Sequence, residues 1–77
     1  MKVKVLIFGL LKDITQTATC EVVDVADTNE MIARMNEKYP GLRNMKYLIA
    51  VEKEIVQGNT LLSDNFTVAL LPPYSGG

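Results

Sequence analysis

The residues best suited to chemistry stand at the end of the sequence, which closes with Pro72-Pro73-Tyr74-Ser75-Gly76-Gly77. We expect the carboxylate of Gly77 to be the reactive group. Glycine lets a backbone pass through a channel too narrow for a Cβ atom, and the two prolines keep the segment out of regular secondary structure. Extended at roughly 3.3–3.6 Å per residue, residues 73–77 would reach about 17 Å. This tail, residues 72–77, is therefore predicted to enter another protein.

Few other residues could act in catalysis. Histidine is absent from the sequence, which excludes a histidine general base, a Ser-His or Cys-His pair and most zinc sites. The single cysteine, Cys20, is an alternative sulfur carrier, because a thiol can hold a persulfide. It stands in a predicted strand with no histidine or nearby basic residue to favour the thiolate, which indicates a small buried side chain instead. We therefore expect no metal site and no bound cofactor in this chain.

The composition indicates a small cytoplasmic protein. Its 77 residues, 48% of them hydrophobic, suffice for a single domain over residues 1–77 but leave little room for an enclosed substrate pocket. Eight Lys and Arg residues are scattered among nine Asp and Glu residues, for a net charge of −1, which disfavours nucleic acid as a partner. The apolar runs are far shorter than the roughly 20 residues that cross a bilayer. One thiol cannot form an internal disulfide, which is consistent with a reducing cytoplasm.

Periodicity and turn residues predict one main helix and several strands. Asp27 or Thr28 can cap a helix of about 11 residues, with Glu30 placed for a capping box, and Pro40-Gly41 should end it. The apolar stripe of this helix is expected to face the core and consists of Met31, Ile32, Met35 and Tyr39. Residues 10–14 could form a turn of helix or a loop. Alternating or β-branched segments predict strands at residues 2–8, 19–25, 47–51, 55–56 and 66–71.

This order of strands and helix predicts an α+β fold, the β-grasp of ubiquitin-like proteins, in which a mixed sheet packs on one main helix. In that arrangement the first and last strands run parallel in the middle of the sheet. Leu6 and Phe8 would then neighbour Ala69 and Leu71 on the face away from the helix, and Ile55 could extend the patch. We expect Leu6, Phe8, Ile55 and Leu71 to form a partner-binding surface at the base of the tail. The alternative is a second packed layer that buries Leu6 and Phe8.

Four segments carry a family resemblance: residues 4–8 (KVLIF), 50–51 (AV), 62–64 (LSD) and the Pro-Pro-x-Ser-Gly-Gly ending of residues 72–77. Together they resemble the MoaD family, the small sulfur-carrying subunit of molybdopterin synthase, over nearly the whole chain. Two positions depart from the family's usual residues, namely Glu52 in place of Asn and Asn65-Phe66 in place of Gly and an acidic residue. Because Asn tolerates the left-handed conformation, the turn at Asn65 is expected to survive.

The resemblance implies a sulfur carrier for molybdenum cofactor biosynthesis. A carboxylate is too poor an electrophile to accept sulfur, so an E1-like adenylating enzyme would use ATP to join the Gly77 carboxylate to AMP. A persulfide donor would then replace oxygen with sulfur and leave a thiocarboxylate. Inserted into the large subunit of molybdopterin synthase, in a two-plus-two assembly, Gly77 would deliver this sulfur to cyclic pyranopterin monophosphate. The catalytic groups would belong to the large subunit, and this chain would be its non-catalytic, sulfur-carrying subunit.

Two other functions use the same activated Gly77. The first is a sulfur carrier for a different acceptor, in thiamine synthesis or tRNA thiolation, and the Pro-Pro-x-Ser-Gly-Gly ending argues against it. The second is a ubiquitin-like protein modifier, in which Gly77 is transferred to a lysine amine. A carrier gains about 16 Da when sulfur replaces oxygen, whereas a modifier forms a conjugate of much higher mass, so intact-mass measurement separates the two.

Overall fold

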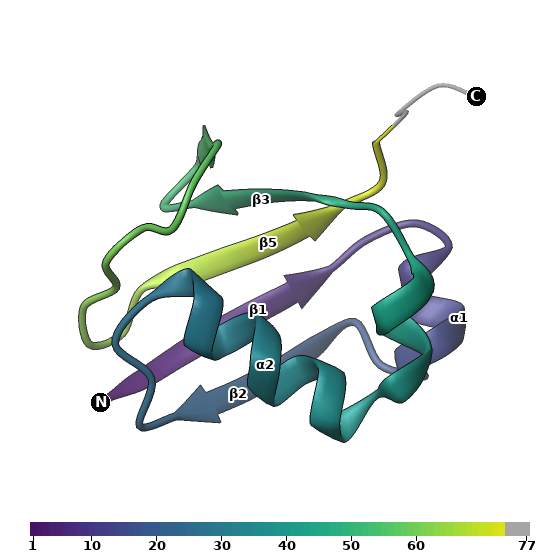
Figure 1. The fold of residues 1–77 in the computed structure, drawn as a ribbon, viewed down its shortest axis with the longest axis horizontal. Helices are drawn as coiled ribbons and strands as arrows, with labels where there is room; N and C mark the ends of the chain where they lie inside the picture. Colours follow the sequence, from purple (N-terminus) through teal and green to yellow (C-terminus); the bar gives the residue numbers. More distant parts are fainter. Residues whose placement is uncertain (74–77) are drawn as a thin grey trace.

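The computed structural model describes residues 1–73, in which five strands form one mixed sheet beside two α-helices and a 3-10 helix (Figure 1). The strands are β1 (Lys2–Ile7), β2 (Thr19–Val23), β3 (Leu48–Val51), β4 (Glu54–Val56) and β5 (Thr67–Leu71). The helices are α1 (Leu11–Thr15), α2 (Thr28–Lys38) and the 3-10 helix η1 (Pro40–Asn44). The predicted β-grasp architecture is thus confirmed.

The sheet places the first and last strands side by side at its centre, in the order β2-β1-β5-β3-β4. β1 and β5 are parallel, with Leu6 opposite Ala69 and Ile7 opposite Leu70. β2 pairs antiparallel with β1, and β3 pairs antiparallel with both β5 and β4. Because β5 has a partner on each side, the tail that follows it is attached to the interior of the sheet.

Helix α2 begins and ends where its sequence signals predict. Asp27 is the N-cap, and its Oδ1 accepts a hydrogen bond of 2.9 Å from the Glu30 amide. The Glu30 side chain reaches back and accepts from the Ala26 amide at 2.7 Å, one residue before the cap. The helix ends at Lys38, because Pro40 disfavours helical geometry at the preceding Tyr39. Within residues 1–73, no helix is long and apolar enough to cross a membrane.

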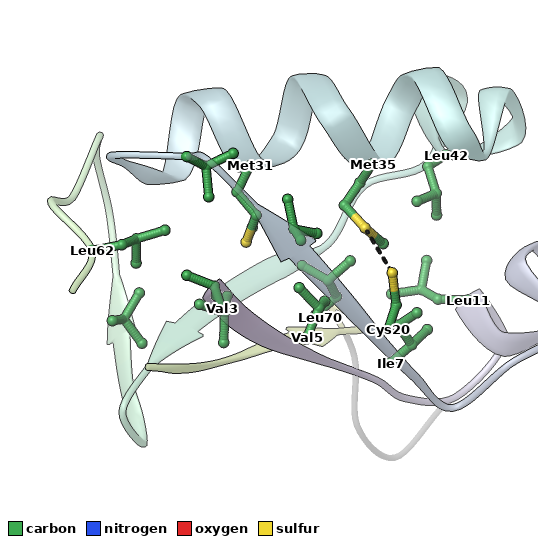
Figure 2. Packing of buried hydrophobic residues seen from close by; sticks show 14 residues of the cluster. Val3, Val5, Ile7, Leu11, Cys20, Met31, Met35, Leu42, Leu62 and Leu70 are labelled. Carbon is green, nitrogen blue, oxygen red and sulfur yellow. Dashed lines mark hydrogen bonds between the residues drawn. The ribbon is translucent and has the colours of Figure 1, made fainter. Parts of the chain in front are cut away.

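The hydrophobic core lies between α2 and one face of the sheet (Figure 2). Met31 and Met35 project from the helix toward Val3, Val5 and Leu70, all of which are almost fully buried. Helix α1 and η1 pack onto the same face, since their buried Leu11 and Leu42 belong to the same cluster. The helices of residues 1–73 therefore contribute to a core on a single side of the sheet.

Two local features differ from the sequence expectation, and a third agrees with it. The second strand stops at Val23 rather than at residue 25, because Asp24 takes a left-handed φ of 59° and donates its amide to the Met1 carbonyl. Pro40-Gly41 open the 3-10 helix η1, and Gly41 is not among the residues with positive φ, so it does not serve as a left-handed stop. Asn65, by contrast, adopts the expected left-handed conformation with a φ of 67°.

Candidate functional site

The base of the tail is held between the centre of the sheet and the turn that follows β1. The Phe8 amide donates to the Leu70 carbonyl at 3.2 Å, which extends the parallel pairing to the end of β5. The chain then leaves the sheet through Pro72, which is half-buried, and Pro73, which is exposed. The remaining predicted tail residues, Tyr74, Ser75, Gly76 and Gly77, lie outside the described residues.

The sheet face away from α2 carries a row of apolar side chains beside this base. Register places Leu6 opposite Ala69, Ala69 opposite Ala50, and Ala50 opposite Ile55, so that the row crosses four strands. Because side chains alternate between faces, this row lies opposite the buried core positions. Ile55 is 55% exposed at the β4 end of the row.

These side chains line an open groove of about 830 Å³. The lining residues are Leu6, Phe8, Ala50, Glu52, Lys53, Ile55, Thr67, Ala69 and Leu71. The structure thus brings together all four residues predicted to bind a partner, including Phe8, which is 44% exposed. Their role in binding stays a prediction. No second packed layer covers Leu6 and Phe8 within residues 1–73, because α1, α2 and η1 pack on the opposite face.

The β3–β4 turn at the rim of the groove has a strained backbone. Glu52 and Lys53 have φ angles of 49° and 74°, in the left-handed region that disfavours residues with a Cβ. Glu52 is tied to β5 twice: its amide donates to the Thr67 carbonyl at 2.9 Å, and its Oε2 accepts from the Thr67 amide at 2.7 Å. The turn is therefore fixed against β5 while Lys53 lies at the rim of the groove.

Charged residues occupy the other end of the same face. Lys2 and Lys4 precede Leu6 on β1, and the Lys2 ammonium lies 3.5 Å from a carboxylate oxygen of Glu21 on β2. The face is thus polar near the start of β1 and apolar near the tail. Among residues 1–73, no three His, Cys, Asp or Glu side chains gather closely enough to hold a metal ion.

Ionisation of one tyrosine is altered by its surroundings. Tyr47 packs against the core cluster, and its burial raises the pKa of the phenol above the ordinary value of 10.0. The hydroxyl therefore stays protonated at neutral pH.

Cys20 is buried, as expected, but its surroundings differ from the expectation. Its thiol contacts the Met35 thioether at 3.9 Å, drawn as the dashed line in Figure 2. The Lys38 ammonium also lies 3.9 Å from Sγ, so the prediction that no basic residue is nearby is wrong. Lys38 is distant in sequence, and helix α2 brings it over β2 by packing across the sheet. The buried thiol within the core cluster agrees with a structural role for Cys20.

Comparison with known proteins places the chain in a family. The sequence model of the ThiS family matches residues 5–77, nearly the full length. The chain belongs to the ThiS family. The resemblance to the MoaD family is also confirmed: the chain is 32% identical to the molybdopterin synthase sulfur carrier subunit of Mycobacterium tuberculosis, an alignment that covers 100% of this chain and 99% of that protein.

Solved structures agree with this assignment to the ThiS family. A protein complex of subunits 1 and 2 of the molybdopterin-converting factor from Helicobacter pylori contains a chain that is 31% identical, with a TM-score of 0.78 and full coverage of both chains. The small archaeal modifier protein 1 of Methanosarcina acetivorans has a TM-score of 0.86 at 23% identity, covering 99% of this chain and 96% of that one. At that identity the second match shows the fold alone.

Sequence reasoning on this ThiS-family chain missed several residues around the groove. Leu48 pairs with Leu71 across β3 and β5 and is 39% exposed, which extends the apolar surface along β3. The charges of Glu52 and Lys53 indicate only a solvated edge, yet both residues line the groove. The positions of these residues beside the groove follow from how β3, β4 and β5 pair. A local sequence pattern does not predict which residues of paired strands lie opposite one another.

Proposed function

We propose that this chain is a sulfur carrier for molybdenum cofactor biosynthesis, with Gly77 as the residue that bears the sulfur. The observation that carries the proposal is the similarity to the M. tuberculosis sulfur carrier subunit, which extends over 100% of this chain at 32% identity. Similarity of that extent covers the Pro-Pro-x-Ser-Gly-Gly ending as well as the domain. It therefore supports a shared role for the tail, residues 72–77, and not only a shared fold.

The geometry at the base of the tail supports delivery by insertion. β5 is hydrogen-bonded on both sides and leads into Pro72 without an intervening loop. Proline restricts the chain before binding, so ordering the tail in a partner costs less conformational entropy. An anchored base and a segment ending in Gly76-Gly77 suit entry into a narrow channel.

The chemistry follows from the need to activate a carboxylate. The Gly77 carboxylate would attack the α-phosphate of ATP on an E1-like enzyme, giving an acyl-adenylate and pyrophosphate. A persulfide sulfur would then attack the carbonyl carbon and displace AMP. Reductive cleavage of the resulting acyl persulfide by a second thiol leaves the thiocarboxylate and a disulfide on the donor. ATP is thus consumed by the activating partner, and this chain itself binds no cofactor.

The apolar groove is proposed as the docking surface for the large subunit of molybdopterin synthase. The H. pylori structure is a complex of subunits 1 and 2 of the molybdopterin-converting factor, and its matching chain is 31% identical to this one. Leu6, Phe8, Ile55 and Leu71 lie beside the base of the tail, so docking there would aim the tail into the same partner. Sulfur would pass to cyclic pyranopterin monophosphate in that subunit, and we place the reaction in the cytoplasm.

Intact-mass spectrometry tests the proposal. The chain purified from its native cell, or incubated with its adenylating enzyme, ATP and a persulfide donor, should gain about 16 Da at Gly77. That mass should be lost when the large subunit and cyclic pyranopterin monophosphate are added. Gly77→Val should not gain the mass, because a branched side chain hinders adenylation or transfer, whereas Gly58→Ala, in open space, should behave as wild type. Normal thiocarboxylate formation by Gly77→Val would refute the assignment.

The family name favours one second candidate, a sulfur carrier for thiamine synthesis. Both functions use the same Gly77 thiocarboxylate and differ in the acceptor. Copurification separates them: capture of a large synthase subunit supports the pterin acceptor, whereas capture of a thiazole-forming enzyme alone would overturn it.

A further inference from the structure

Gly9 lies against the first proline of the tail. It follows Phe8 in the turn between β1 and α1 and has a left-handed φ of 61°. A Cβ atom placed on Gly9 would lie 2.5 Å from Cγ of Pro72 and 3.5 Å from its Cδ. The first distance is far below van der Waals contact, so Pro72 can occupy its position only because residue 9 has no side chain.

On one side of this contact Gly9 is fixed, because hydrogen bonds hold its turn at both ends. The Gly9 carbonyl accepts from the Lys12 amide at 3.1 Å, which ties the turn to helix α1. The Phe8 amide donates to the Leu70 carbonyl at 3.2 Å, which ties it to β5. Pro72 is the first residue beyond the β5 pairing and has no amide hydrogen to hold it. Under steric pressure at Gly9, Pro72 is therefore the group that moves.

We propose that Gly9 is a positioning residue that sets the direction in which the tail leaves the sheet. This inference rests on the proposed function, in which the tail enters a partner. Bringing a 2.5 Å contact to ordinary van der Waals distance requires a shift of about 1 Å. A rotation at Pro72 is amplified along the residues that follow, each adding roughly 3.3–3.6 Å. Misplacement of a reacting group by about 1 Å can lower a rate by about 100-fold.

A double-mutant cycle between Gly9 and Pro72 isolates this contact from backbone strain. Pro72→Ala removes Cγ and Cδ but keeps Cβ, which would lie at an ordinary 3.7 Å from a Cβ on residue 9. Gly9→Ala introduces the same left-handed strain in both backgrounds, so that strain cancels in the cycle. We expect Gly9→Ala to slow sulfur transfer to the large subunit by about 10- to 100-fold when residue 72 is Pro, and by about twofold when it is Ala.

The position of Pro72 can be measured in the free chain by nuclear magnetic resonance, without any partner. We expect a nuclear Overhauser effect between the Gly9 Hα protons and the Pro72 ring in the wild type. Gly9→Ala should shift the Leu71 amide and the Pro72 ring signals while leaving those of Lys12 and α1 nearly unchanged. Because this measurement needs no sulfur chemistry, failure of the sulfur-carrier proposal and failure of the positioning proposal are distinguishable.

Two other glycines provide matched controls. Gly58→Ala meets no atom within 4 Å and should change neither measurement. Gly41→Ala would approach Ile14 Cγ2 at 2.9 Å, so it should lower stability without moving Pro72 or slowing transfer in the folded protein.

If Gly9→Ala folds, any of three results would overturn the proposal: equal losses from Gly9→Ala in both backgrounds, signal changes confined to residues 9–12, or a Pro72 ring that shows no contact with Gly9 in the wild type. If Gly9→Ala fails to fold, restoration of folding by Pro72→Ala supports the contact. Failure of the double variant to fold refutes it.

Discussion

The two faces of the sheet carry similar apolar residues, but one face is covered by helices and the other is open. Along β5, Val68 and Leu70 point toward α2 and are fully buried, at 0% exposure. Ala69 and Leu71, which alternate with them, line the open groove. The two sets differ little in hydrophobicity, so side-chain type alone does not decide which face is covered. The decisive factor is the placement of the helices: α1, α2 and η1 all pack on one side.

This difference separates stability from recognition within a single strand. Apolar surface buried on the helix side contributes to folding, at about 25 cal/mol per Å². Apolar surface that stays exposed on the groove side does not contribute to folding until a partner covers it, and an exposed apolar patch of this kind is typical of an interaction site. Substitutions at neighbouring positions should therefore produce different defects, which makes the comparison testable.

The largest effect is expected for Leu70→Ala on the helix side. Leu70 is fully buried among Val3, Val5 and the two methionines of α2, so the substitution leaves a cavity in the core. It should lower the free energy of unfolding by about 2–5 kcal/mol, measured by urea denaturation. A Leu70→Ala protein as stable as the wild type would break the distinction between the faces.

Leu71→Ala, one residue further along, should have the opposite profile. Its side chain lines the groove, so the free energy of unfolding should change by about 1 kcal/mol or less. Affinity for the large subunit should fall by about 10- to 100-fold, because truncation of a central apolar anchor costs binding energy. Calorimetric titration measures this affinity. Unchanged binding would show that the groove is not the docking surface.

The smallest effect is expected at the strained turn on the groove rim. Lys53→Gly places glycine at a φ of 74° and should raise the free energy of unfolding by about 0.5–1 kcal/mol. Lys46→Gly is the matched control, since Lys46 is exposed and is not among the residues with positive φ. It should lower stability by about 0.4–1 kcal/mol, because glycine increases the entropy of the unfolded chain. If both variants shifted the urea midpoint of unfolding in the same direction from that of the wild type, the assignment of strain at Lys53 would be contradicted.

Sequence reasoning succeeded where the determining signal is local. The Asp27 cap, the Met31 and Met35 stripe and the left-handed Asn65 each depend on residues within a few positions of one another. The alternation of β5 was also readable, and the β-grasp topology then indicated which of its faces is open. These features supplied the fold and four groove residues.

The features that were missed depend on contacts between distant residues. Lys38 approaches Cys20 only because α2 crosses β2, and Leu48 lies beside the groove residue Leu71 only through the register of β3 with β5. The contact between Gly9 and Pro72 joins the two ends of the chain. Sequence periodicity and residue propensity do not predict such contacts, because the contacts form only when distant helices and strands pack together.

The parallel pairing of β1 with β5 also determines when the protein can fold during synthesis. The central strand pair joins the beginning of the chain to its end, so β1 has no parallel neighbour until Thr67–Leu71 have left the ribosome. Long-range pairing of this kind cannot form early. Chains released before β5 should remain unfolded and be degraded, since the middle of their sheet is missing. Under the proposed function, a chain that ends before β5 would therefore not compete with the complete protein for the large subunit.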